Sequence, residues 1–133
     1  AGPAPRGRGE RILVVDDEEL LTCIMEQALT KLGYVVEAAT QPEAALALVR
    51  AEPRRFALVI TDQTMPGMTG MALAGELRLL NPAQLIILTT GYSVSLTPER
   101  LRAAGIARLL LKPTTLDALG SAVHAVLVPA SAP

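Results

Sequence analysis

Short apolar runs alternate with stretches of helical periodicity five times along this chain, and that alternation restricts the fold more than any other feature of the sequence. The apolar runs cover residues 12–15, 34–38, 56–61, 85–89 and 106–111. Runs this apolar are typical of strands that are buried on both faces of a sheet. Helices between such strands make the strands parallel and cover both faces of the sheet. We therefore expect an α/β fold with a (βα)5 doubly wound five-stranded parallel sheet.

Each predicted helix has a recognisable start or stop. Gly33 ends the first helix, and the Thr-Gln-Pro-Glu sequence at 40–43 predicts a capping box with Thr40 as N-cap of the second. Residues 97–100 predict the cap of a short fourth helix, and Thr114 begins the last one. Five such units in 133 residues cannot close a (β/α)8 barrel, which needs about 250 residues.

Proline, glycine and alanine dominate both ends of the chain. We expect a flexible linker over residues 1–9, one domain over 10–128 and a flexible tail over 129–133. A single cysteine, Cys23, excludes an intramolecular disulfide and is typical of a reducing compartment. The net charge of −1 and the absence of a long apolar run give no reason to expect nucleic-acid or membrane contact. A cytoplasmic location is therefore expected.

Three of the four aspartates directly follow predicted strands. Asp16 and Asp17 follow the first strand and Asp62 follows the third, so these carboxylates converge at one edge of the sheet if the two strands are neighbours. Grouped carboxylates repel one another unless a cation joins them, and hard oxygen ligands suit Mg²⁺. Glu18 and Glu19 are better explained as the acidic start of a helix. That explanation does not cover Asp62, so we expect a magnesium site formed by the three aspartates.

Hydroxyl and ammonium groups follow the remaining strands. Thr89 and Thr90 end the fourth strand, and Lys112, one of only two lysines, ends the fifth. A threonine ending a strand and a lysine in a surface ion pair are each common alone. Together with a divalent cation, however, a hydroxyl and an ammonium group are the parts needed to bind a phosphoryl group. No Gly-Lys-Ser/Thr loop for nucleotide phosphates is present.

Four segments of the chain resemble the receiver domain of two-component response regulators. They are residues 12–18, 61–70, 86–92 and 109–113, and the resemblance extends over about residues 10–128. The resemblance implies a flavodoxin-like topology and a phosphoacceptor signalling domain rather than an enzyme. It also implies that the phosphodonor is a phosphohistidine on a histidine kinase or a histidine phosphotransfer domain.

The resemblance gives the acidic residues separate roles. Asp62 matches the phosphoacceptor, which attacks the phosphoryl group and becomes an aspartyl phosphate. Asp16 and Asp17 match the acidic pair that holds Mg²⁺ together with Asp62. The backbone carbonyl of Thr64 would complete the protein ligands.

Other positions match the switch residues of the family. Thr90 corresponds to the hydroxyl that meets the phosphoryl group, and Lys112 to the cation that pairs with Asp62 and then with the phosphate. Pro113 implies a cis peptide before it. Leu109 stands where the family usually has Tyr or Phe, so we expect normal phosphorylation but an altered change on the face formed by the fourth helix, fifth strand and fifth helix. Tyr92 and Thr64 match positions that modulate how fast water reaches the aspartyl phosphate in this family, and Tyr92 is expected to shield it.

Two other functions stay open at this point. A phosphohydrolase using an aspartyl phosphate would need an aspartate where this chain has Thr64. A receiver-like interaction module that is not phosphorylated is favoured only by Leu109.

The parent protein is also open. Residues 5–17 resemble the junction before the C-terminal receiver domain of hybrid sensor histidine kinases. The chain is therefore either part of such a kinase, tethered to a membrane-bound sensor, or a stand-alone regulator. Homodimers are common in the family, but nothing in this sequence requires one.

Overall fold

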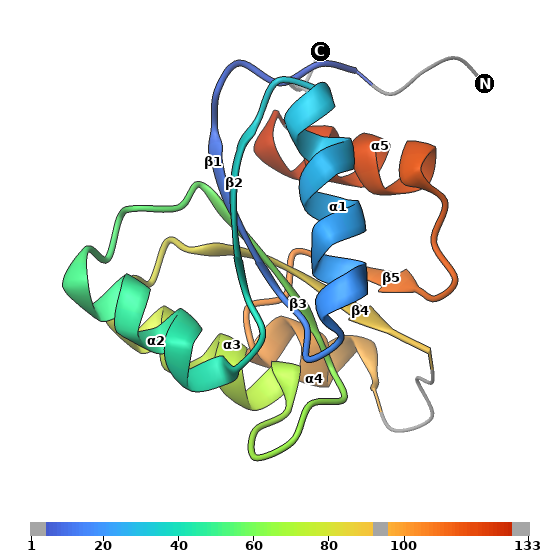
Figure 1. Cartoon of the computed structure of the whole chain (residues 1–133). Coiled ribbons are helices and arrows are strands. Elements are labelled where there is room, and N and C mark those ends of the chain that lie inside the picture. Colours follow the sequence, from blue (N-terminus) through green and yellow to red (C-terminus); the bar gives the residue numbers. More distant parts are fainter. Residues whose placement is uncertain (1–4, 92–95, 129–133) are drawn as a thin grey trace, which may run out of the picture.

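A five-stranded parallel sheet forms the centre of the molecule, in the strand order β2-β1-β3-β4-β5 (Figure 1). The computed structural model describes residues 5–91 and 96–128. The strands are β1 (Arg11–Val15), β2 (Val35–Ala39), β3 (Leu58–Asp62), β4 (Leu85–Thr90) and β5 (Arg108–Leu111). The predicted (βα)5 fold is confirmed, and β1 and β3 are neighbours as the convergence of the aspartates requires.

Helices cover both faces of the sheet (Figure 1). They are α1 (Glu19–Lys31), α2 (Pro42–Ala51), α3 (Gly70–Leu80), α4 (Pro98–Ala103) and α5 (Leu116–Leu127). α1 and α5 contact each other on one face, and α2 and α3 contact each other on the other. Within the described part of the chain, no helix is both long and apolar enough to cross a membrane.

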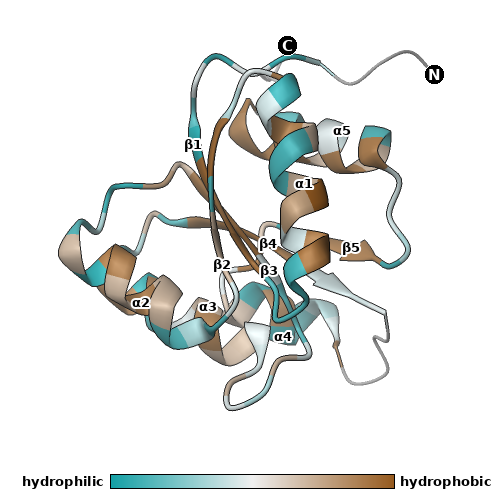
Figure 2. Cartoon of the chain, viewed as in Figure 1, coloured by the Kyte–Doolittle hydropathy of each residue, from teal (hydrophilic) through white to brown (hydrophobic). Residues whose placement is uncertain are grey.

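Side-chain alternation along the strands divides the apolar core into two layers. Figure 2 shows hydrophobic colouring along much of β3 and β4, at the centre of the sheet. Leu13 of β1 and Val59 of β3 face α2 and α3, whereas the next residues, Val14 and Ile60, face α1 and α5. These four side chains are at most 1% exposed. Burial on both faces explains why the strands are apolar throughout rather than at alternate positions. It also leaves the strand ends as the place where polar side chains can gather.

One predicted helix cap is wrong. The N-cap of α2 is Gln41 rather than Thr40, and no side chain caps the helix. Pro42 has a fixed φ and no N–H, which favours the first helical position, so the cap shifts to the residue before it. By contrast, Thr97 caps α4 as expected, and Thr115 caps α5 one residue after the predicted start at Thr114.

The last residues of the predicted linker lie against the domain. The N–H of Gly9 donates to the Gly33 carbonyl at 2.8 Å, and the N–H of Gly7 donates to that of Leu32. Gly7 also lies so close to the Tyr34 ring that a Cβ there would overlap it. Residues 1–4 of the linker and the whole predicted tail lie outside the described residues. The division of the chain into linker, domain and tail stays a prediction.

Candidate phosphoacceptor and metal site

The strand order brings the predicted site residues to one edge of the sheet. Asp62 is the last residue of β3, and Asp16 directly follows β1. Thr90 ends β4 on the other side of β3, and Lys112 directly follows β5. Each residue is therefore fixed at the end of a strand of the same sheet, which gives the site a rigid base.

Three carboxylates lie close together at this edge. One oxygen from each of Asp16, Asp17 and Asp62 lies within 4.8 Å of the other two. Asp16 and Asp62 are 2% and 6% exposed, whereas Asp17 is open to solvent. The N–H of Glu18 donates to Asp16 Oδ1 at 2.9 Å, which orients that carboxylate as the chain enters α1. Two buried acids beside an exposed one, all with oxygen donors, fit a small hard cation that keeps part of its water shell.

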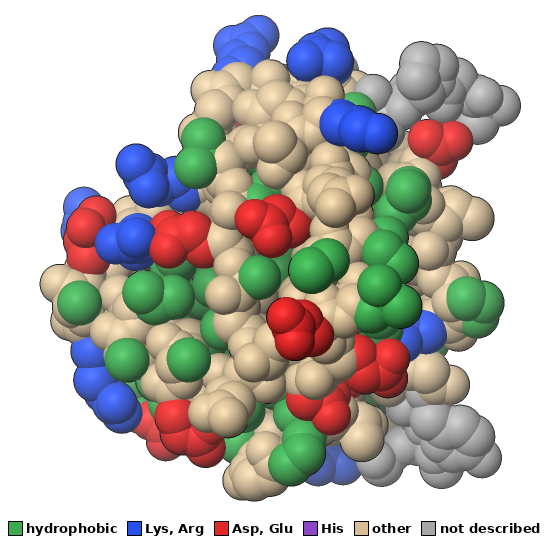
Figure 3. All heavy atoms as spheres, in the orientation of Figure 1, with side chains coloured by type: hydrophobic (Ala, Val, Ile, Leu, Met, Phe, Trp, Pro, Cys, Tyr) green, Lys and Arg blue, Asp and Glu red, His purple; other side chains and the backbone are tan. Residues whose placement is uncertain are grey.

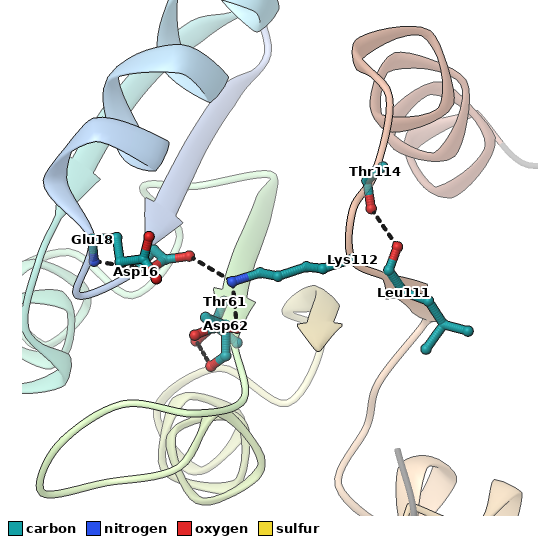
Figure 4. Close-up of polar contacts among 7 residues, drawn as sticks. All are labelled: Asp16, Glu18, Thr61, Asp62, Leu111, Lys112 and Thr114. Carbon is teal, nitrogen blue, oxygen red and sulfur yellow. Dashed lines mark hydrogen bonds and ion pairs between the residues drawn. The ribbon is translucent and has the colours of Figure 1, made fainter. Parts of the chain in front are cut away.

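Lys112 spans the gap between two of these acids (Figure 4). Its Nζ lies 3.0 Å from Asp62 Oδ1 and 3.3 Å from Asp16 Oδ2. The N–H of Lys112 donates to the Thr90 carbonyl at 2.8 Å, so the side chain starts from a fixed backbone position. The peptide between Lys112 and Pro113 is cis, as the resemblance implies.

Burial and charge act in opposite directions on the site's protons. Burial raises the pKa of the Asp62 carboxyl, and with the charge of Asp16 it outweighs the lowering effect of Lys112. Burial lowers the pKa of Lys112, but its hydrogen bonds and its attraction to Asp62 and Asp16 together raise it above its ordinary value. The Lys112 ammonium therefore stays charged. Without a metal ion, the ionised form of Asp62 is less favourable than that of an aspartate in water.

In metal-free protein, Asp62→Asn is expected to gain stability relative to the parent as the pH rises. The folded chain binds more protons than the unfolded chain between the two pKa values of Asp62, because the folded pKa is the higher one. The parent's free energy of unfolding therefore falls as the pH rises between these two pKa values, a range that begins at about pH 3.9. Asparagine does not titrate. Urea unfolding in EDTA from about pH 3.5 to about pH 7 measures the difference, and a constant difference would contradict the expectation.

Gln63 organises the loop after β3, a role that sequence reasoning missed. Its N–H donates to the Thr89 carbonyl at 2.8 Å, and its side-chain Oε1 accepts from the N–H of Met71 at 2.9 Å. Its carbonyl accepts from the N–H of Gly70 at 2.9 Å. No local pattern marks a glutamine for this role, because all three partners lie at least seven residues away. Thr64 follows Gln63 as an exposed residue, and its part as a carbonyl ligand stays a prediction.

The two threonines of β4 lie in different surroundings. Thr90 is 1% exposed. Thr89, which lies opposite Asp62 in the sheet register, lines a groove together with Asp16 and Lys112. The resemblance assigns the switch hydroxyl to Thr90, and that assignment stays a prediction.

Two predicted modulating positions differ in what the structure describes. Leu109 is half-buried in β5, opposite Leu88 of β4. Tyr92 lies outside the described residues.

A site of this kind can bind a divalent cation and a phosphoryl group together. The carboxylates supply the ligands, Lys112 supplies a second positive charge, and Asp62 supplies a nucleophilic oxygen. The sequence matches the response regulator receiver domain family over residues 12–124. The chain belongs to this family.

Curated relatives of this receiver domain include much longer proteins. The virulence sensor protein BvgS of Bordetella pertussis is 37% identical over 130 residues, which cover 92% of this chain but 10% of BvgS. The chain thus spans about a tenth of the length of that relative.

Solved structures share the fold of this receiver domain. TrrA of Thermotoga maritima, solved in complex with Mg²⁺ and BeF, is 33% identical with a TM-score of 0.79, and the match covers 89% of this chain and 99% of TrrA. A response regulator of Burkholderia pseudomallei with a phosphorylated aspartic acid and a calcium ion is 28% identical with a TM-score of 0.76. That match covers 90% of this chain and 67% of the regulator. The chain is a receiver domain of two-component systems, as the resemblance predicted.

Proposed function

We propose that Asp62 accepts a phosphoryl group from a phosphohistidine, with Mg²⁺ held by Asp16, Asp17 and Asp62. The observation that carries this proposal is the grouping of the three carboxylates within 4.8 Å, with the Lys112 ammonium 3.0 Å from Asp62. The similar regulator with a phosphorylated aspartic acid and the similar complex with Mg²⁺ and BeF support it. The Thr64 carbonyl is a further proposed ligand.

The residues of the chain divide the transfer between them. An Asp62 carboxylate oxygen forms the new O–P bond while the P–N bond to the histidine breaks, and the ring nitrogen keeps the electron pair. When bound, Mg²⁺ neutralises charge on the phosphoryl oxygens and on the carboxylates. Lys112 moves from pairing with Asp62 to pairing with the phosphoryl group, and the Thr90 hydroxyl donates to a phosphoryl oxygen. The chain acts on its own aspartate only and turns over no separate substrate.

The donor is a histidine kinase or a histidine phosphotransfer domain. The relationship to BvgS supports a place within a hybrid sensor kinase, in the same polypeptide as the donor and tethered to a membrane-bound sensor. A cytoplasmic location follows from that arrangement. No nucleic acid or membrane contact is proposed for the domain itself.

Intact mass after incubation with Mg²⁺ and acetyl phosphate tests the proposal. The expected result is a single phosphoryl adduct that requires Mg²⁺ and that peptide mapping assigns to Asp62. No adduct, despite measurable Mg²⁺ binding, would overturn the proposal and favour the interaction module that Leu109 supports.

Leu109→Tyr is expected to change the response to phosphorylation rather than the reaction. Leu109 is half-buried opposite Leu88 of β4 and is not one of the proposed reacting groups, so the rate of phosphorylation should stay within about twofold of the parent. The aromatic ring should enlarge the phosphorylation-dependent change on the face formed by α4, β5 and α5. Amide hydrogen exchange of α4 and β5, with and without phosphorylation, measures this change. A large fall in the phosphorylation rate would contradict the expectation.

A further inference from the structure

An apolar groove of about 470 Å³ opens beside the acidic site, between α1 and the start of α5. Asp16, Thr89 and Lys112 form its polar part, and they come from the strand ends that carry the proposed phosphoacceptor. The rest of the lining comes from α1, the β5–α5 connection and α5: Leu21, Ile24, Met25, Pro113, Thr114, Leu116 and Leu119. The volume lies within the range of pockets that hold small molecules.

The apolar walls of this groove are left open to solvent. Ile24 of α1 is 41% exposed and Leu116 of α5 is 50% exposed, although both are large hydrophobic residues. Leu20, one helical turn before Ile24, is 72% exposed. Figure 3 shows hydrophobic side chains gathered along the α1 side of the molecule, with acidic side chains below them near the beginning of α1. Apolar surface beside a polar site is typical of ligand binding.

The charges of the groove indicate which kind of molecule it suits. Lys112 lines the groove and also lies 3.0 Å from Asp62 Oδ1, so a phosphoryl group at Asp62 would lie where the groove meets the acidic site. Among the described residues, none that lines the walls away from Asp16 and Lys112 is charged. An occupant with an anionic phosphoryl head and an uncharged apolar body matches both parts.

We propose that this groove binds the apolar group of small phosphodonors, so that the chain reacts faster with longer-chain aliphatic acyl phosphates than with acetyl phosphate. The inference rests on the proposed phosphorylation of Asp62. In this reaction an Asp62 oxygen forms a bond to phosphorus while the bond between phosphorus and the acyl oxygen breaks. The acyl group leaves as a carboxylate with the electron pair, so the step needs no proton, oxidant or reductant.

The chain-length series gives a measurable effect. Each methylene that is fully removed from water raises the second-order rate constant of phosphorylation about fourfold. Butyryl phosphate has two more methylenes than acetyl phosphate, so its second-order rate constant should be about tenfold higher in an open groove that buries most of them. Initial rates of adduct formation with acetyl, propionyl and butyryl phosphate at fixed Mg²⁺, followed by intact mass, measure the trend.

Two variants connect the trend to the groove. Ile24→Gln places an amide on the groove wall at a side chain that is already 41% exposed, so folding should be preserved. The ratio of its butyryl phosphate rate to its acetyl phosphate rate should fall close to one. Leu79→Gln is the matched control, because Leu79 is 80% exposed on α3 and outside the groove. Leu79→Gln should react faster with butyryl phosphate than with acetyl phosphate by the same factor as the parent.

Three results would overturn the inference, and they are distinguishable. Equal rates for the three donors in the parent, with clear reaction from acetyl phosphate, would overturn the groove assignment alone. A gain that persists in Ile24→Gln would show that the acyl chain binds elsewhere. No adduct from any donor would overturn the proposed phosphorylation, and the inference would fall with it.

Discussion

Asp62→Asn is expected to lower the rate of phosphoryl transfer to this domain by more than about a thousandfold. The amide has no negative oxygen to attack phosphorus. No other described residue places a carboxylate at the end of β3, where Asp62 lies. The asparagine side chain would keep the shape of the aspartate, so the loop after β3 should stay in place. Intact mass with Mg²⁺ and acetyl phosphate, over a time course, measures the loss directly.

Asp117→Asn provides the matched control. Asp117 is the one aspartate outside the site, exposed in the first turn of α5. Its replacement removes the same charge and should leave the rate of phosphorylation unchanged. A phosphoryl adduct that persists in Asp62→Asn but disappears in another aspartate variant would transfer the acceptor role to that residue.

Gly70→Ala is expected to destabilise the domain by about 1–3 kcal/mol, the usual cost of inserting a methyl group into a well-packed position. Gly70 begins α3, and a Cβ there would overlap the backbone carbonyl of Asp62 and the side chain of Leu88. Backbone atoms cannot move aside without shifting the end of β3. The strain should therefore also slow phosphorylation, because the shift reaches Asp62. Urea unfolding and the adduct assay measure the two effects.

Gly75→Ala tests the opposite case in the same helix. Gly75 is exposed, and a Cβ there would meet no atom within 4 Å. Alanine loses less conformational freedom in a helix, so this variant should be about 0.5–1 kcal/mol more stable than the parent. Equal effects of the two substitutions would contradict the proposed contact between α3 and the phosphoacceptor.

The layered fold was predictable because its signals are local. Buried parallel strands have to be apolar along their whole length, and helices with one apolar stripe have to pack on them. Gly33, with a φ of +101°, ends α1 and turns the chain into β2, as its position after the helical pattern indicated.

The position of the site was predictable for a related reason. Parallel strands all end at the same edge of their sheet, so Asp16, Asp62 and Lys112 had to lie along one edge once β1, β3 and β5 belonged to one sheet. The strand order, with β1 beside β3, then brought Asp16 next to Asp62. The resemblance to a known family added the roles of these residues, which spacing does not supply.

Other features depend on contacts between segments that are distant in the sequence. Gln63 joins Thr89 to the beginning of α3 through hydrogen bonds. The groove forms because apolar side chains of α1 and α5 line a space beside Lys112 without filling it. Gly7 is required because the Tyr34 ring occupies the space where its Cβ would be.

Periodicity along the chain thus established the number, type and order of the elements and the edge of the sheet that carries the charged residues, because each of these depends on a residue and its near neighbours. Packing of the folded chain decided the 3.0 Å pairing of Lys112 with Asp62, the raised pKa of Asp62 and the open groove beside them. Those properties depend on distances and burial between residues far apart in sequence, which only the assembled layers bring together.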